Sequence, residues 1–252
     1  MTLIVAHVSA VGAVMAADSH VAEEDHTGGL ADKIWTTGTL LFGYSGNMAV
    51  RDRLRQAIEA ELARSPLPVP IDCEMAASQL KASMRPILQQ AYADFVGGPD
   101  DSPVEALGGS LLVVGRDNGR YWLLEIDRNN TSSHYTEDGF HTTGSGSTAA
   151  HVGRRLLQHY ALPGYETKHL RLLAMRTVKS CIDVLGGAYG LGGPVQLWQA
   201  TDNGYEQVRG DELASVVEGV QQWVQIEKES LSKVFAATVE APPGPLPDAL
   251  QG

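Results

Sequence analysis

Thr2 carries a hydroxyl that can act as a nucleophile if removal of Met1 leaves it at the N-terminus. A threonine hydroxyl is weakly nucleophilic by itself and needs a base beside it. An α-amine has a pKa of roughly 7.7 to 8.0, so a useful fraction is unprotonated near neutral pH and can accept the hydroxyl proton. Thr2 is therefore a candidate nucleophile that would carry its own base.

A carboxylate and an amine follow at positions that could support Thr2. Asp18 lies at the end of the second predicted strand, and Lys33 lies where the next one opens. A lysine near the threonine favours loss of protons from its neighbours, and an aspartate keeps that lysine charged and oriented. Taken singly, Asp18 also fits a turn residue and Lys33 a solvated side chain.

Small residues could supply the remaining parts of a hydrolytic site. Gly46 ends a predicted strand, where a backbone N–H could face a developing oxyanion; the alternative is a plain turn glycine. Ser145 and Ser147 precede a predicted helix and could bind the α-amine or cap the helix. Capping is the preferred interpretation for Ser147.

The elements that must position these residues alternate in a regular order. Apolar runs predict strands and apolar residues at three- and four-residue steps predict helices, in the order strands, two helices, strands, two helices, strands. The predicted strands are 2–8, 11–17, one opening at 31–34, 40–44, 110–114, 121–126, 195–199 and 205–208. The predicted helices are 48–64, 72–96, 147–160, 166–185 and 211–235. This order predicts an α+β protein, a four-layer α-β-β-α sandwich.

The length of 252 residues fits one main domain with an extension. We predict a hydrolase domain over 2–210, a helical extension over 211–238 and a disordered, Pro-rich tail over 239–252. The formal charge of −11 argues against nucleic acid or an anionic membrane as a partner. No secretory signal or spanning helix is evident, which predicts a cytoplasmic location.

Neither a cofactor nor a metal ion is indicated by the sequence. The two cysteines, Cys73 and Cys181, lie far apart without a CxxC or a matching histidine cluster. The eight histidines show no metal-ligand spacing. Hydrolysis by an N-terminal threonine needs neither kind of group.

In order and spacing, these segments resemble those of β-type proteasome subunits and bacterial proteasome-like peptidases, which are N-terminal-nucleophile hydrolases. The resemblance spans roughly residues 2–200 and implies the same four-layer fold. It rests on Thr2, AADS with Asp18, DKI with Lys33, GYSG with Gly46, and GSGS with Ser145 and Ser147. It implies that Thr2 is the nucleophile, that Lys33 tunes its proton affinity with Asp18 as partner, that Gly46 is an oxyanion donor and that Ser145 supports the amine.

The chain departs from that pattern in two places. Where many members of that family have Asp-x-x-Ser-Gly-Gly, this chain has 188–193 (AYGLGG), and Asp183 is a candidate replacement for the missing aspartate. His20 stands where arginine is frequent. Three functions stay open: a self-compartmentalising homo-oligomeric threonine peptidase acting on peptides or unfolded proteins, a non-catalytic scaffold, and a small-molecule amide hydrolase. An ATPase partner is not identified by the sequence.

Overall fold

Two antiparallel sheets of five strands each form the centre of the molecule. The computed structural model describes residues 2–20, 29–96, 109–159 and 166–240. The first sheet has the order β10-β9-β2-β1-β8, with β1 Leu3–Val8, β2 Ala13–Ala17, β8 Phe140–Gly144, β9 Gln196–Thr201 and β10 Gly204–Gln207. The second has the order β3-β4-β5-β6-β7, with β3 Ile34–Thr37, β4 Leu40–Ser45, β5 Ser110–Asp117, β6 Arg120–Ile126 and β7 Ser132–His134.

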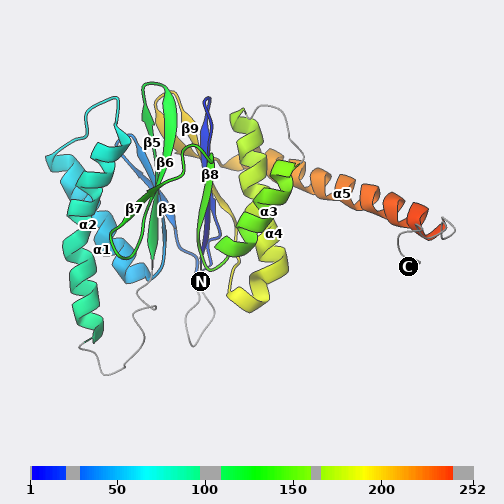
Figure 1. The fold of residues 1–252 in the computed structure, drawn as a ribbon, viewed down its shortest axis with the longest axis horizontal. Coiled ribbons are helices and arrows are strands. Elements are labelled where there is room, and N and C mark those ends of the chain that lie inside the picture. The colour runs from blue at the N-terminus through cyan, green and yellow to red at the C-terminus, as the bar shows by residue number, and fades with distance from the viewer. Residues whose placement is uncertain (1, 21–28, 97–108, 160–165, 241–252) are drawn as a thin grey trace, which may run out of the picture.

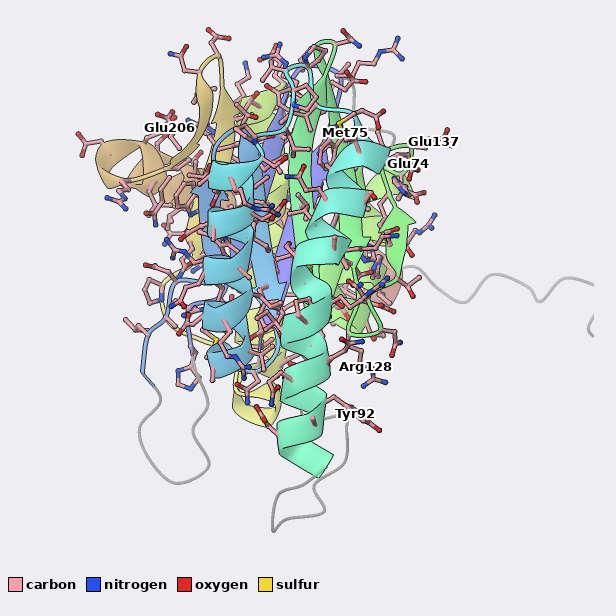
Figure 2. The ribbon with its side chains drawn as sticks, turned by 90° about the vertical axis from the view of Figure 1, so that its left-hand side faces the viewer. Glu74, Met75, Tyr92, Arg128, Glu137 and Glu206 are labelled. Carbon is pink, nitrogen blue, oxygen red and sulfur yellow. The ribbon has the colours of Figure 1, made fainter. Side chains whose placement is uncertain are left out.

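Helices cover the outer face of each sheet, so the predicted four-layer α-β-β-α sandwich is confirmed (Figure 1). One pair lies side by side across the second sheet, as Figure 2 shows. That pair is α1 Met48–Arg64 and α2 Cys73–Val96. The pair on the first sheet is α3 Ser147–His159 and α4 Thr167–Tyr189.

Strand β1 shows why two sheets must stack. Its residues are all buried, because Ile4 and Ala6 face the second sheet while Leu3 and Val5 face the helices on the other side. Successive side chains of a strand point to opposite faces, so an uninterrupted apolar run requires cover on both. Thr2, directly before β1, therefore lies at the start of a fully buried strand.

The hairpin predicted at Asn118-Gly119 is confirmed between β5 and β6. Asn118 and Gly119 have φ of 45° and 82°, the positive values that a two-residue hairpin turn favours. Strands β7 and β8 were not predicted, because their sequences (SSH and FHTTG) contain little apolar character. Strand β8 nevertheless lies beside β1, where four of its five residues are buried.

A fifth helix, α5 Gly210–Glu240, contains the whole predicted extension and continues two residues into the predicted tail. Its first part packs Val216 and Val220 onto the core beside α4, and the rest projects away from the body (Figure 1). Residues 241–252 lie outside the described residues. None of the helices in the described part of the chain combines the length and apolarity of a bilayer-crossing segment.

Candidate active site

Thr2 directly precedes β1 and is 6% exposed. Its backbone N–H donates to Ser145 Oγ at 3.4 Å, and Ser145 Oγ in turn lies 3.3 Å from the Thr2 carbonyl oxygen. Gly144, which pairs with Leu3, permits this approach: its φ is +99°, and a Cβ there would lie 2.1 Å from the Thr2 carbonyl oxygen. Ser145 is thus the side chain that contacts the backbone of Thr2 on both sides.

Asp18 connects the start of β1 to Lys33. Its Oδ1 accepts hydrogen bonds from the Leu3 N–H and from Lys33 Nζ, both at 2.8 Å. The side chains of Asp18 and Lys33 are 0% and 1% exposed, so this ion pair is fully removed from water. A buried carboxylate is tolerated where hydrogen bonds and a counter-charge satisfy it, as they do here.

Lys33 lies immediately before β3, and its Nζ also donates to the His20 carbonyl oxygen at 2.7 Å. Burial lowers the pKa of Lys33, and the charge of Arg51 lowers it further, while the Asp18 carboxylate opposes both effects. A lowered lysine pKa brings the loss of the Lys33 charge closer to working pH, so the contact with Asp18 extends the pH range over which Lys33 stays charged.

Gly46 lies at the same end of the sandwich as Thr2. The residue before it, Ser45, ends β4, and Ser45 Oγ lies 2.9 Å from Thr143 Oγ1 on β8, across from the strand that follows Thr2. Gly46 has a φ of +134°, which a residue with a Cβ rarely adopts. The position fits a backbone donor at the site, and the oxyanion role of Gly46 stays a prediction.

Ser147 does not join this group. Helix α3 begins at Ser147 itself, and the Gly146 carbonyl oxygen accepts the first helical hydrogen bond, from Ala150. Gly146 therefore occupies the N-cap position that was expected for Ser147. Among the described residues, no hydrogen bond joins the Ser147 side chain to Thr2.

Backbone groups of the 188–193 segment brace Asp18 in place of an Asp-x-x-Ser motif. The Gly192 N–H donates to Asp18 Oδ2 at 3.4 Å, and the Gly192 carbonyl oxygen accepts from the N–H groups of Ser19 and His20. Asp183 is exposed on α4, whereas Asp18 is fully buried. In the described part of the chain, the backbone of Gly192 braces Asp18, and replacement of the missing aspartate by Asp183 stays a suggestion.

Gln196 is a site residue that the sequence did not reveal. Its Oε1 accepts from the Lys33 N–H at 3.0 Å, and its Nε2 donates to the Ala31 carbonyl oxygen at 2.6 Å. The side chain thereby fixes the segment that presents Lys33. No motif marks Gln196, since it begins β9, 163 residues further along the chain.

The two-sheet sandwich, with a buried Asp–Lys pair at the end of β2, the central strand of the first sheet, has the proteasome-like N-terminal-nucleophile fold. Solved structures of Anbu, the ancestral beta-subunit, share it. The protein from Yersinia bercovieri has 16% identity and a TM-score of 0.69, with 98% of this chain and 100% of that chain covered. An Anbu (Gly-1) mutant from Hyphomicrobium sp. strain MC1 has 16% identity and a TM-score of 0.68, covering 92% and 97%. The Pseudomonas aeruginosa Anbu complex, a helical assembly, has 19% identity and a TM-score of 0.70, covering 98% and 99%.

These similarities correct the resemblance drawn from motif order. No family model matches the chain, and no curated protein matches it. The similar structures named above are Anbu proteins, their identity of 16 to 19% shows a shared fold alone, and none is described as a peptidase. The assignment to β-type proteasome subunits and proteasome-like peptidases is therefore wrong.

Proposed function

We propose that the chain is an N-terminal threonine hydrolase that cleaves peptide bonds with Thr2 after Met1 is removed. The observation that carries this proposal is the Asp18 carboxylate, which binds both the Leu3 N–H and Lys33 Nζ. One buried group thereby holds the residue after the nucleophile and the amine that tunes it. Replacing a buried ion pair by apolar residues is often neutral or stabilising, so protein stability alone does not explain why Asp18 and Lys33 are buried here.

In the proposed reaction, the Thr2 hydroxyl attacks the peptide carbonyl carbon and loses its proton to the α-amine. The tetrahedral oxyanion is stabilised by the Gly46 N–H. The α-amine then passes the proton to the substrate nitrogen, and the cleaved fragment leaves as an amine, giving an ester on Thr2. A water activated by the same α-amine then hydrolyses the ester. Lys33 favours the deprotonated hydroxyl, Asp18 orients Lys33, and Ser145 positions the Thr2 backbone.

Intact-mass measurement of the purified protein tests the first requirement of this mechanism. We expect the mass of one methionine residue to be missing, since the α-amine of Thr2 must be free to act as a base. A protein that retains Met1 and cleaves peptides undiminished would contradict the mechanism. Retained Met1 without activity would favour the scaffold function instead.

The pH dependence of peptide cleavage should respond to Arg51. Because the positive charge of Arg51 lowers the pKa of Lys33, removing it by Arg51→Gln favours the protonated amine. Because the mechanism uses the charged form of Lys33, the basic limb of kcat/KM should therefore move to higher pH, by roughly half a unit for a partly solvated charge. Arg53→Gln on the same helix is the control, since Arg53 is exposed and pairs with Asp94. An unmoved limb in Arg51→Gln would argue that Lys33 does not tune the reacting groups.

We further propose that the hydrolase domain, 2–210, assembles into a homo-oligomer through the helical extension, 211–238. The assembly would enclose Thr2, so that only unfolded chains reach it. Ile226, Leu231 and Phe235 on α5 are 62%, 56% and 67% exposed, which is unusual for large apolar side chains on one helix. The P. aeruginosa Anbu complex is a helical assembly, which supports assembly of this fold.

Replacing Leu231 and Phe235 together by serine should shift the native protein from the assembly to smaller species in light scattering, because it removes apolar area available for contact between copies. Gln222→Ser, a polar change on the same helix, should leave the size unchanged. A wild-type monomer would argue against a protein-degrading chamber and favour a small-molecule amide hydrolase with the same mechanism.

A further inference from the structure

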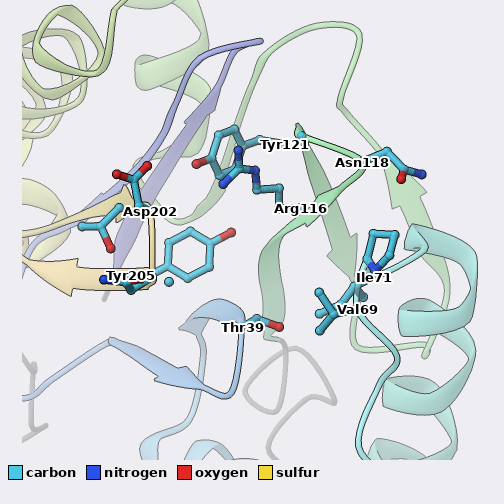
Figure 3. Close-up of a pocket in the computed structure, with 13 residues that line it drawn as sticks. Thr39, Val69, Ile71, Arg116, Asn118, Tyr121, Asp202 and Tyr205 are labelled. Carbon is cyan, nitrogen blue, oxygen red and sulfur yellow. The ribbon is translucent and has the colours of Figure 1, made fainter.

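A pocket of about 370 Å³ lies at the end of the sandwich away from Thr2. Its walls are the β3–β4, β5–β6 and β9–β10 turns and the connection between α1 and α2 (Figure 3). Strand β4 separates this pocket from the candidate active site, since Thr39 in the pocket precedes β4 and Ser45 at the other end lies beside β8. The pocket is thus a second feature, built from other residues.

One wall of the pocket is apolar and the opposite side is aromatic. Val69 and Ile71, from the α1–α2 connection, face the rings of Tyr121 and Tyr205 across the pocket (Figure 3). At about 30 Å³ for each water-sized group, the volume holds roughly twelve heavy atoms. A predominantly apolar pocket of this size with a few polar groups is typical of small-molecule sites.

The pocket also carries one charge of each sign. Arg116 is the second-last residue of β5, and its guanidinium lies 5.3 Å from the centroid of the Tyr121 ring. Asp202 comes from the β9–β10 turn. Among the described residues, neither side chain forms an ion pair or a hydrogen bond with another. Two opposite charges without protein counter-charges therefore line one apolar pocket.

The hydroxyl of Tyr205 adds a polar group that lacks a protein partner. The Tyr205 side chain extends from β10 into the space between the other lining groups (Figure 3). Its Oη is buried and has no hydrogen-bond partner among the described residues. Burial raises the pKa of Tyr205, which keeps the hydroxyl protonated and able to donate. Leaving a buried hydroxyl unpaired is costly, so a ligand acceptor here would relieve that cost.

We propose that this pocket binds a free α-amino acid with a large apolar side chain, of the size of leucine or phenylalanine. The ligand carboxylate binds Arg116 and accepts from the Tyr205 hydroxyl, the ligand ammonium group binds Asp202, and the side chain packs against Val69 and Ile71. Zwitterion recognition requires both charges, and the pocket has one of each. No group around Thr2 takes part, so this site is independent of the proposed hydrolase.

Titration calorimetry with L-phenylalanine, N-acetyl-L-phenylalanine and L-phenylalaninamide tests the proposal. The wild-type protein should bind phenylalanine saturably and each blocked compound about tenfold more weakly, since each has lost one charge-assisted contact. Arg116→Gln should weaken phenylalanine binding about tenfold and remove the preference over the amide. Asp202→Asn should remove the preference over the acetylated compound.

The control is Arg120→Gln, which changes an exposed arginine of the same hairpin that does not line the pocket and should leave binding unchanged. The altered side chains are exposed, and melting temperatures confirm that each variant is folded. The proposal is overturned if neither phenylalanine nor leucine binds saturably up to its solubility. It is equally overturned if the preferences for the free amine and the free carboxylate persist in both pocket variants.

Discussion

Thr2→Ala is expected to abolish cleavage of fluorogenic peptides, lowering kcat/KM by about a thousandfold or more, because removing a nucleophile removes the whole covalent pathway. The change deletes a hydroxyl and a methyl group from a side chain at the edge of the core. The fold should therefore survive, and the melting temperature and native size should stay close to those of the wild-type protein.

Thr2→Ser is the matched control for this experiment. It keeps the hydroxyl and the α-amine and should retain measurable cleavage, since the chemistry needs the oxygen and its base. Substantial cleavage by Thr2→Ala would show that another residue attacks the substrate. Loss of cleavage in Thr2→Ser together with a lower melting temperature would point to the packing of the threonine methyl group instead.

Lys33→Met is expected to lower both activity and stability. Its partner Asp18 is 0% exposed, so removing the lysine charge leaves a buried carboxylate without its counter-ion. Breaking such a pair costs about 3–5 kcal/mol of unfolding free energy. Urea denaturation measures this loss, and the same protein should show no peptide cleavage under native conditions.

The double variant Lys33→Met with Asp18→Asn separates structure from catalysis. A neutral amide can still accept from the Leu3 N–H, and no unpaired charge remains buried, so we expect at least about half of the lost stability to return. Cleavage should stay absent, because the amine that tunes Thr2 is still missing. If the double variant recovers cleavage along with stability, Lys33 has a structural role alone.

The structure brings together most of the site residues that the sequence nominated. Thr2, Asp18, Lys33 and Ser145 contact one another directly or through Leu3, and Gly46 lies at the same end of the sandwich. Ser147 was nominated from its spacing alone, and the backbone placed Gly146 at the cap instead. The predicted start of the helix at Ser147 is confirmed, but local spacing in GSGS did not decide which residue caps it, because the cap depends on where β8 stops pairing with β1.

The sequence could predict elements whose signal is local. The apolar run before Ser9, the three- and four-residue apolar steps of α1 and the Asn118-Gly119 turn each reflect interactions within a few residues. Strand β8 was not predicted because most of its residues are polar, and they are buried by the neighbouring elements of the fold. His141, for example, is buried beside Glu125, whose carboxylate binds it at 2.9 Å.

By itself the sequence determined the order of strands and helices, and with it the four-layer sandwich and the candidates Thr2, Asp18 and Lys33. Tertiary structure alone decided how the site is braced. Gln196 reaches Lys33 across 163 residues, and Gly192 reaches Asp18 across 174. Both contacts exist because β9 pairs with β2, which places the start of β9 beside the end of β2. Such pairing depends on burying both faces of two sheets at once, and this cannot be predicted from any short segment of the sequence.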